Sequence, residues 1–596
     1  MMALTDISDM KKGYEELTGD RVTVGLATCG ISAGADKTLE KLRATELGIF
    51  LDTVGCAGMC YAEPIVTVKQ GKVFSIYGHV TEDKADVLIQ AIKQKKVCNE
   101  LLLGHSLEEI DYYKKQKRIL MANCGKVNPQ SMNQYIANGG YNGLVKALKM
   151  KPEQAIEEVS ISGLRGRGGA GFPTAKKWSL IAAKQGRKIL VCNGDEGDPG
   201  AFMNRVVMES DPFKLIEGMT IASYAIGSKE GIIYTRAEYP LAVKTLELAM
   251  ETARKHKLLG KDIMGVKGFD FDIRMKMGAG AFVCGEETAL IGSIMGNRGN
   301  PMFRPPYPAE KGIDGNPTNI NNVSTLSFIP VIFSMGGSEY AKIGTEKTKG
   351  TAVLCLAGKI KRAGVIEVPM GIKLREIIFD IGGGVGEGTK FKAVQAGGPA
   401  GGCISEKELD TPLEFETITA LGAIMGSGGL VVLNDEACMV DVAKYFMSFT
   451  KGESCGKCTP CREGTTRLFE ILDKITRGLG TKEELEKAKV LAQFIRENSL
   501  CGLGQGAPNP FISTVNKFPD EYLAHIDRRE CPSHACKNLV KYFILKSCVG
   551  CGACAKQCPV NAISGKLKEL HVIDQDKCIR CGACFDACAF DAIERK

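Results

Sequence analysis

Hydrophobic residues recur at regular spacings through the first hundred positions, and the pattern predicts a small α/β layer. Residues 21–29 (RVTVGLATC) have the composition of a strand, and residues 35–48 (ADKTLEKLRATELG) carry the spacing of a helix. Residues 65–78 (IVTVKQGKVFSIYG) predict a β-hairpin that turns at Gln70 and Gly71. Residues 83–96 (DKADVLIQAIKQKK) predict a closing helix.

Further apolar runs mark later strands. Residues 188–193 (KILVCN) predict a strand that leads into a polar loop, and residues 351–358 and 364–371 predict two more. A helix is expected from Leu374, followed by the glycine-rich stretch of residues 391–404. No window contains 18 consecutive apolar residues, and the N-terminus is polar without a signal-peptide core. We therefore expect a cytoplasmic protein without a membrane span.

Length, composition and charge constrain the number of domains and the class of protein. A chain of 596 residues is too long for one core and suggests about four domains. Apolar residues make up 44% and charged residues 24%, as in an ordinary globular protein. The formal net charge of +8 counts every thiol as neutral, whereas iron-bound cysteines are thiolates. We infer no nucleic-acid binding from this charge.

Cysteine spacing near the C-terminus carries the strongest chemical signal. Two runs of the form C-x2-C-x2-C-x3-C begin at Cys548 and Cys578, a spacing typical of a ferredoxin module with two [4Fe-4S] clusters. The fourth cysteine of each run then ligates the other cluster. One predicted set is Cys548, Cys551, Cys554 and Cys588, and the other is Cys578, Cys581, Cys584 and Cys558. A pair of zinc sites or a disulfide knot is the alternative.

A third cluster is predicted upstream. Cys455, Cys458 and Cys461 share one loop, and Cys501 follows about forty residues later. Three cysteines on one loop and one distant cysteine predict a [4Fe-4S] pocket closed over a helical insert.

Two other cysteine groups leave alternatives open. His525, Cys531 and Cys536 are candidate ligands of a structural zinc ion, with Cys438 or His534 as the fourth ligand; the alternative is that these side chains only pack. Near the N-terminus, Cys29, Cys56 and Cys60 resemble part of the thioredoxin-like [2Fe-2S] ferredoxin motif. The motif expects a further cysteine near Val24, and three thiolates leave such a cluster one ligand short. An empty domain is the alternative.

Four polar segments in the middle of the chain are candidates for cofactor binding. The first is GLRGRGGAGFPTAKKW from Gly163, in which glycines such as Gly169 allow a backbone to approach a phosphate. The second is the loop after the strand at residues 188–193, where α/β proteins bind ligands. The third contains Glu286 and Glu287 at a helix start, and the fourth is GNPTNINNVSTL.

At these four segments the chain closely resembles the NADH-oxidising flavoprotein (51 kDa-type) family of complex I. The resemblance implies one FMN with the nicotinamide stacked on its face. It places nine residues on the FMN side: Gly166, Arg167, Gly168, Lys177, Asn193, Asp195, Glu286, Asn321 and Asn322. It places six on the dinucleotide side: Phe172, Glu196, Asp198, Glu287, Arg304 and Tyr307.

Two departures from the family pattern affect the dinucleotide. Arg304 and Tyr307 stand where complex I relatives usually have lysine and phenylalanine, and Asp198 replaces a glutamate. An arginine can pair with a 2′-phosphate or contact the pyrophosphate, so NAD and NADP both remain open.

The resemblance implies a multidomain α/β and α+β protein. Its expected parts are a thioredoxin-like head (1–110), an FMN/NAD(P)-binding domain (111–342), a β-grasp domain (343–432), a helical-bundle [4Fe-4S] domain (433–542) and a two-cluster ferredoxin domain (543–596). This order resembles the diaphorase subunit of multimeric, electron-bifurcating [FeFe] hydrogenases. Such a subunit implies a hydrogen-activating partner, a small thioredoxin-like [2Fe-2S] partner and ferredoxin as a further candidate. The alternatives are a formate dehydrogenase subunit and a non-catalytic electron-transfer subunit.

Overall fold

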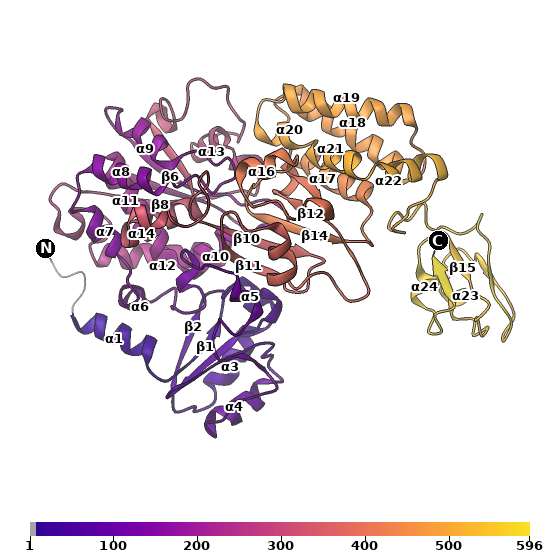
Figure 1. The fold of residues 1–596 in the computed structure, drawn as a ribbon, viewed down its shortest axis with the longest axis horizontal. Helices are drawn as coiled ribbons and strands as arrows, with labels where there is room; N and C mark the ends of the chain where they lie inside the picture. Colours follow the sequence, from indigo (N-terminus) through magenta and orange to yellow (C-terminus); the bar gives the residue numbers. More distant parts are fainter. Residues whose placement is uncertain (1–6, 596) are drawn as a thin grey trace. The chain divides into compact units, whose positions relative to one another are not determined.

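The computed structural model describes residues 7–595, which divide into two compact units. The first unit is Met1–Glu387 with Val394–Val432, and the second is Gly388–Ala393 with Leu433–Lys596. The chain crosses from one unit to the other three times, after Glu387 and then within the strands β12 (Phe391–Ala396) and β14 (Gly429–Asn434). Figure 1 shows the course of the chain in colour. In the part of the chain that the structure describes, no helix combines the length and the apolar character needed to cross a bilayer.

The N-terminal part of the first unit is a five-stranded sheet in the order β2-β1-β3-β4-β5 (Figure 1). Strand β1 pairs parallel with β2 and antiparallel with β3. The elements are α1 (Ile7–Thr18), β1 (Arg21–Gly25), α2 (Thr28–Ser32), α3 (Ala35–Arg43), β2 (Phe50–Val54), η1 (Cys60–Ala62), β3 (Val66–Gln70), β4 (Val73–Tyr77), α4 (Ala85–Lys93) and β5 (Leu102–Gly104).

The predicted strand, helix, hairpin and helix are present, with local corrections. The predicted strand 21–29 ends at Gly25, and Cys29 instead lies on the short helix α2. The hairpin turns at Gly71 and Lys72 rather than at Gln70 and Gly71, because Gln70 still pairs with Val73. Gly71 has a φ of 59°, which a glycine adopts without strain. Strand β2 was not predicted.

The centre of the first unit is a parallel four-stranded sheet in the order β8-β7-β6-β9, surrounded by helices (Figure 1). Helices α11 and α14 are buried along almost their whole length, which explains why they are apolar on all sides. The elements are α5 (Asp111–Lys114), α6 (Met132–Ala137), α7 (Asn142–Ala147), α8 (Pro152–Ser162), α9 (Thr174–Ala182), β6 (Ile189–Gly194), α10 (Met203–Ser210), α11 (Pro212–Ile226), β7 (Glu230–Arg236), α12 (Pro240–Lys255), β8 (Asp272–Gly278), α13 (Glu287–Ile294), β9 (Thr318–Asn322), α14 (Val323–Met335) and α15 (Gly337–Tyr340).

A second five-stranded sheet has the order β11-β10-β14-β12-β13. Its further elements are β10 (Thr351–Gly358), β11 (Gly364–Pro369), β13 (Gly402–Ser405) and α16 (Phe415–Ala420). The helix expected from Leu374 is present: residues 374–375 are α-helical and continue into the π-helical segment η6 (Glu376–Ile381).

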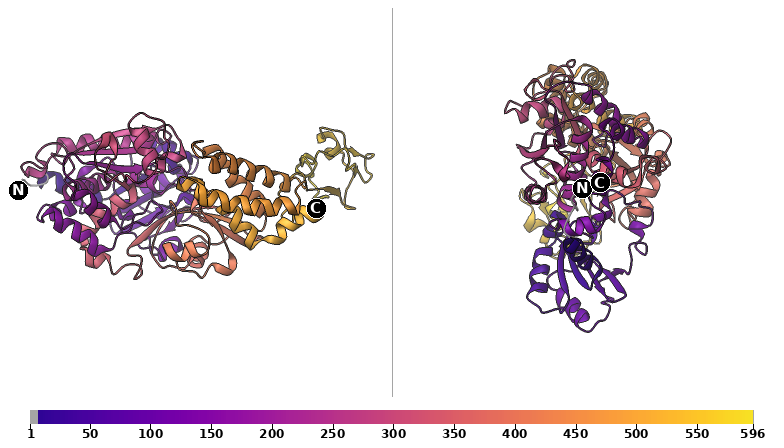
Figure 2. Two further views of the ribbon diagram at one scale, coloured as in Figure 1. Left: turned by 90° about the horizontal axis from the view of Figure 1, so that it is seen from above. Right: turned by 90° about the vertical axis from the view of Figure 1, so that its left-hand side faces the viewer.

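The second unit begins with a group of long helices that run side by side, drawn in orange in Figure 2. Apolar residues at helical spacing, such as Leu468, Leu472 and Ile475 on one helix, form their common core. The helices are α17 (Met439–Glu453), α18 (Thr459–Thr476), α19 (Lys482–Asn498), α20 (Gly502–Gly506), α21 (Asn509–Lys517), α22 (Pro519–Leu523) and the π-helical η9 (Ala524–Arg528).

The last fifty residues form two similar halves, and each half consists of a strand, a short helix and a second strand. The strands of one half pair with those of the other. Strand β15 pairs with β18, and β16 pairs with β17. The elements are β15 (Tyr542–Ile544), α23 (Ala553–Gln557), β16 (Ile563–Ser564), β17 (Val572–Ile573), α24 (Ala583–Asp586) and β18 (Ile593–Arg595).

A buried carboxylate on β11 holds the segment of residues 119–121, which leads into the central domain. Glu367 on β11 accepts hydrogen bonds from the backbone N–H groups of Ile119 (2.9 Å), Leu120 (3.0 Å) and Met121 (2.9 Å). It also accepts from Thr351 Oγ1 at 2.5 Å, and it is completely buried. The side chain of Glu367 therefore holds residues 119–121 against the sheet that contains β11.

We expect Glu367→Ala to lower the free energy of unfolding by about 3 kcal/mol, because three buried N–H groups lose their acceptor. The measurement is the midpoint of thermal unfolding by circular dichroism. The control is Glu339→Ala, which removes an exposed carboxylate paired only with Lys342 and should leave the midpoint unchanged. Equal midpoints for both variants would contradict the role of Glu367.

Candidate functional site

The carboxyl ends of β6 and β9 bring together two predicted site residues. These strands pair in parallel, with Asn193 beside Asn322 and Cys192 beside Asn321. Asn193 Nδ2 donates to the carbonyl of Gly285 at 3.0 Å, and its Oδ1 accepts from the Asp195 N–H at 3.0 Å. The polar loops after the two strands therefore start from one edge of the sheet, where α/β proteins bind ligands.

The glycine-rich loop of residues 163–172 packs against this edge. Its ends are joined by a hydrogen bond from the Gly166 N–H to the Phe172 carbonyl at 2.8 Å. A Cβ at Gly168 would come within 3.2 Å of the Asn322 Cβ, so only glycine allows this approach comfortably. Gly169 has a φ of 113°, which also favours glycine. The loop leaves backbone atoms accessible next to the sheet edge, as a phosphate-bearing flavin requires.

The two cationic residues predicted on the FMN side differ in what they contact. Arg167 is buried, and its guanidinium donates to the carbonyls of Arg165, Lys349 and Thr351. Its charge therefore holds the loop to the following segment. Lys177 on α9 is half-buried and donates to the Ile320 carbonyl at 2.9 Å.

Glu287 contacts one residue predicted on the FMN side and one predicted on the dinucleotide side. Lys177 Nζ donates to Glu287 Oε2 at 3.3 Å, and Arg304 Nη1 donates to Oε1 at 2.8 Å. Phe172 and Tyr307, which belong to the neighbouring loops, expose 44% and 54% of their surface. Two exposed rings and three charged groups thus lie at the predicted nucleotide position, available to a ligand that stacks and carries phosphate.

The remaining acidic residues accept hydrogen bonds from the protein itself. Glu286 caps α13, because one of its oxygens accepts from the N–H groups of Thr288 and Ala289 at 2.9 Å each. Glu196 is buried and accepts from the N–H groups of Asn204 and Arg205 at the start of α10. Burial raises the pKa of Glu196 to about 7.

Asp198 and Asn321 are also held by neighbouring side chains. Asp198 accepts a hydrogen bond from Ser427, and burial raises its pKa to about 6. Asn321 Oδ1 accepts from the Trp178 indole at 3.0 Å and from Asn319 at 2.8 Å. These contacts position the backbone of both loops.

Sequence reasoning missed three residues that shape the site. Arg236, at the end of β7, pairs with Asp195 at 3.3 Å, and the hydroxyl of Tyr239 donates to the Glu196 carbonyl at 2.6 Å. Ser427 is distant in sequence and carried no signal. The only available signal for Arg236 was its position at the end of an apolar strand, at the same sheet edge.

In the second unit, the cysteines of the predicted third cluster lie near one another. Cys458 is the N-cap of α18, Cys461 lies in its first turn, and Cys501 precedes α20. The pKa of the Cys461 thiol is raised to about 11 by burial, with smaller contributions from Cys458, Cys501 and Cys455. Two anionic ligands at the start of a long helix suit a cluster, because the helix N-terminus favours negative charge.

In the C-terminal module, each predicted crossed ligand set lines its own cavity. One cavity is lined by Cys548, Cys551, Cys554 and Cys588, and the other by Cys558, Cys578, Cys581 and Cys584. Backbone N–H groups donate to sulfur at equivalent positions of both halves, from Gly550 to Cys548 at 3.4 Å and from Arg580 to Cys578 at 3.3 Å. Thiolate donors and N–H···S bonds fit [4Fe-4S] clusters.

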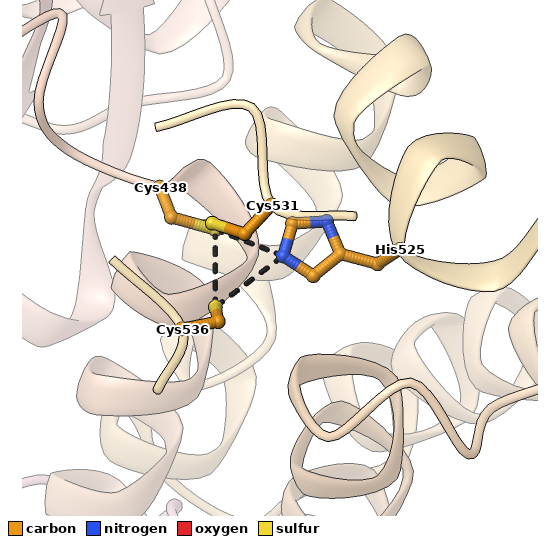
Figure 3. A group of neighbouring side chains, drawn as sticks. All are labelled: Cys438, His525, Cys531 and Cys536. Atoms are coloured by element: carbon orange, nitrogen blue, oxygen red, sulfur yellow. Dashed lines mark hydrogen bonds between the residues drawn. The ribbon is translucent and has the colours of Figure 1, made fainter. Parts of the chain in front are cut away.

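The candidate zinc ligands of the second unit converge in a buried group (Figure 3). His525 Nε2 lies 3.4 Å from Cys438 Sγ and 3.3 Å from Cys536 Sγ, and Cys531 completes the group. The other ring nitrogen of His525 lies 2.7 Å from the Glu521 carbonyl, which leaves Nε2 free to ligate. Of the two candidates for the fourth position, the structure brings Cys438 to this group.

Three of the four cysteines of the N-terminal domain also converge. The sulfur atoms of Cys29, Cys56 and Cys60 lie within 4.8 Å of one another. Val24, where the motif expects a cysteine, is fully buried in β1 and offers no ligand atom.

Comparison with known proteins defines the class. Residues 159–331 match the model of the Nuo51 FMN-binding domain, and residues 441–525 match the NADH-ubiquinone oxidoreductase-F iron-sulfur binding region. Residues 547–592 match a 4Fe-4S dicluster domain. The chain therefore belongs to the NADH-oxidising flavoprotein (51 kDa-type) family of complex I, as an FMN- and iron-sulfur-binding oxidoreductase subunit.

Individual relatives refine this assignment. The chain is 54% identical over 460 residues to the NADP-reducing hydrogenase subunit HndC of Solidesulfovibrio fructosivorans, covering 77% of this chain and 94% of that protein. It is 44% identical over 404 residues to the F subunit of the NADH-quinone oxidoreductase of Aquifex aeolicus, covering 68% and 93%. A chain from the crystal structure of an NAD+-reducing [NiFe]-hydrogenase in the H2-reduced state aligns with a TM-score of 0.61 at 28% identity, covering 87% of each chain.

The buried Glu196 generates a pH prediction. Its folded pKa of about 7 lies above the unfolded value of about 4.3. Between these two values the unfolded chain loses the Glu196 proton before the folded chain does. The contribution of Glu196 to the free energy of unfolding is therefore largest at low pH and is lost as the pH rises toward 7. We expect Glu196→Gln to unfold with a smaller change in thermal midpoint between pH 5.5 and 7.5 than the unsubstituted protein. Parallel pH profiles, measured by circular dichroism, would argue against a titrating Glu196.

Proposed function

We propose that the chain is the diaphorase subunit of a cytoplasmic multisubunit [FeFe] hydrogenase, which transfers electrons between NAD(P)H and iron-sulfur clusters through FMN. One observation carries the proposal: Glu287 contacts both Lys177, predicted on the FMN side, and Arg304, predicted on the dinucleotide side. FMN, when bound, accepts the two electrons of a hydride together and releases them singly. The relationship to HndC supports the hydrogenase assignment.

In this proposal the chain positions the flavin with backbone and neutral groups. The glycine-rich loop (Gly166, Gly168 and Gly169) approaches the phosphate, and Asn193 and Asn322 hold the adjoining sheet edge. Lys177 supplies positive charge. Arg167 acts as a positioning residue, since its guanidinium is bound to backbone carbonyls.

The dinucleotide then binds at Phe172, Glu287, Arg304 and Tyr307. Exposed rings offer stacking surfaces, and the Glu287 carboxylate offers an acceptor for ribose hydroxyls or the nicotinamide amide. The side chain of Arg304 is 39% exposed, so its guanidinium is able to leave the ion pair with Glu287 and bind a phosphate of the ligand instead. Glu196 and Asp198 support this pocket from within the loop that follows β6.

We assign the five domains as the sequence predicts, with boundaries after residues 110, 342, 432 and 542. We assign three [4Fe-4S] clusters to the three cysteine sets that begin at Cys455, Cys548 and Cys578. The two cavities of the C-terminal module support the crossed ligands, Cys588 in the second set and Cys558 in the third. Partners are a hydrogen-activating subunit, a small [2Fe-2S] subunit and ferredoxin, in an anaerobic, electron-bifurcating complex.

The group of Cys438, His525, Cys531 and Cys536 is assigned a structural zinc ion. Four buried N and S donors with no open position suit a closed tetrahedral site. This site connects the start of α17 to the segment after η9.

Replacement of Glu287 tests the nucleotide site. We expect the protein to reduce a viologen dye with NADH or NADPH, and Glu287→Ala to raise the KM by about ten-fold or more, since a charged hydrogen bond is lost. Glu339→Ala removes an exposed glutamate from α15 and is the matched control. Steady-state kinetics with both nucleotides measure the effect. If the purified protein is colourless and lacks flavin, or if neither nucleotide reduces it, the proposed diaphorase function is wrong. The non-catalytic electron-transfer subunit would then be the remaining hypothesis.

Replacement of Cys455 tests the electron path. We expect Cys455→Ser to retain reduction of bound flavin by NAD(P)H and to lose transfer to the C-terminal clusters, because the intervening cluster lacks a ligand. Stopped-flow absorbance and electron paramagnetic resonance follow the two steps. Normal transfer in this variant would refute the assigned path. The identity of the catalytic subunit that co-purifies distinguishes a hydrogenase from a formate dehydrogenase.

A further inference from the structure

The three N-terminal thiols form a tighter group than a binuclear cluster needs. Cys29 Sγ lies 3.3 Å from Cys56 Sγ, and Cys56 Sγ lies 3.8 Å from Cys60 Sγ. In a [2Fe-2S] cluster, four protein ligands are divided between two iron atoms. Here all three sulfur atoms lie within 4.8 Å of one another, as around a single ion.

The spacing fits a tetrahedral zinc ion. With a Zn–S bond of about 2.3 Å, two thiolates of one tetrahedral ion are separated by about 3.8 Å. The Cys438 group provides an internal comparison, because its Cys438 and Cys536 sulfur atoms are 3.6 Å apart. Both groups thus have the dimensions of a mononuclear site.

A fourth donor lies beside one thiol of the N-terminal group, outside the set of three sulfur atoms that lie within 4.8 Å of one another. Glu63 Oε1 lies 3.4 Å from Cys29 Sγ, close to the separation of about 3.6 Å expected for oxygen and sulfur on one zinc ion. The carboxylate is held in place because its Oε2 accepts from the Ile65 N–H at 2.9 Å. Glu63 exposes only 7% of its surface, so its carboxylate is directed into the protein.

The four donors are buried or half-buried and lie beside one another. A divalent cation would bind their deprotonated forms and neutralise the charge gathered there.

We propose that Cys29, Cys56, Cys60 and Glu63 bind one zinc ion in a closed structural site. Four protein donors leave no position for a substrate. Zinc is the metal of choice because it accepts mixed thiolate and carboxylate ligands without a geometric preference of its own.

The location of the site gives it a structural task. Thr28, next to Cys29, donates to Glu209 of α10, and the Cys56 N–H donates to Ser210 Oγ at 3.0 Å. Gly58, between the other two cysteines, accepts a backbone hydrogen bond from Val365 of β11 at 2.9 Å. The ion would therefore fix the loops that attach the N-terminal domain to the rest of the first unit.

Metal analysis of the full-length protein, purified without air, tests the proposal. We expect Cys56→Ser and Glu63→Gln each to contain one zinc ion fewer per chain than the unsubstituted protein, with unchanged iron. Cys98→Ser, a buried lone thiol of the same domain, is the matched control and should retain full zinc. Cys438→Ser should remove the other zinc ion and leave this one in place.

Cobalt substitution provides a readout that does not depend on variants of the N-terminal site. Co2+ in the unsubstituted protein should show thiolate charge-transfer bands and tetrahedral ligand-field bands from both sites, and Cys438→Ser should retain those of the N-terminal site. Loss of iron and of a [2Fe-2S] paramagnetic signal in Cys56→Ser would overturn the proposal. Unchanged zinc in that variant, or a Cys29–Cys56 disulfide in the purified protein, would overturn it equally. None of these outcomes depends on NAD(P)H oxidation.

Discussion

Buried negative charge must be compensated, and this constraint determines much of the structure. Glu367 accepts from three successive backbone N–H groups, and Glu196 accepts from two at the start of α10. Glu217 likewise accepts from the N–H groups of Tyr141 and Leu144. Cys438 and Cys458 occupy the N-cap positions of the long helices α17 and α18. Carboxylates and thiolates therefore lie where helix starts or turns present unpaired N–H groups.

Local spacing made the metal sites predictable, whereas distant contacts did not. The ferredoxin cysteines follow one another at short intervals, so both crossed sets could be predicted, and each set lines one cavity. Cys438 lies 98 residues before Cys536, and only the folded chain distinguishes it from His534. Glu63 was not predicted as a ligand, because a single glutamate carries no spacing signal.

The nucleotide site shows the same division between local and distant information. The order of strands and polar loops predicted a sheet edge, and the pairing of β6 with β9 places Asn193 beside Asn322. The contacts of individual side chains could not be predicted. The resemblance places Arg167 and Glu286 on the FMN side, and the structure adds that Arg167 binds backbone carbonyls and Glu286 caps a helix. Charged residues in a loop have several satisfactory partners, and the choice depends on packing of distant segments.

The two halves of the C-terminal module repeat their backbone hydrogen bonds to sulfur, but some of the side chains around the two cavities differ. His571 and Phe590 line one cavity, while Tyr542 and Val560 line the other. Reduction potentials respond to polarity and solvent exposure near a cluster. Equal thiolate ligands in unequal surroundings therefore let the two assigned clusters hold an electron with unequal strength.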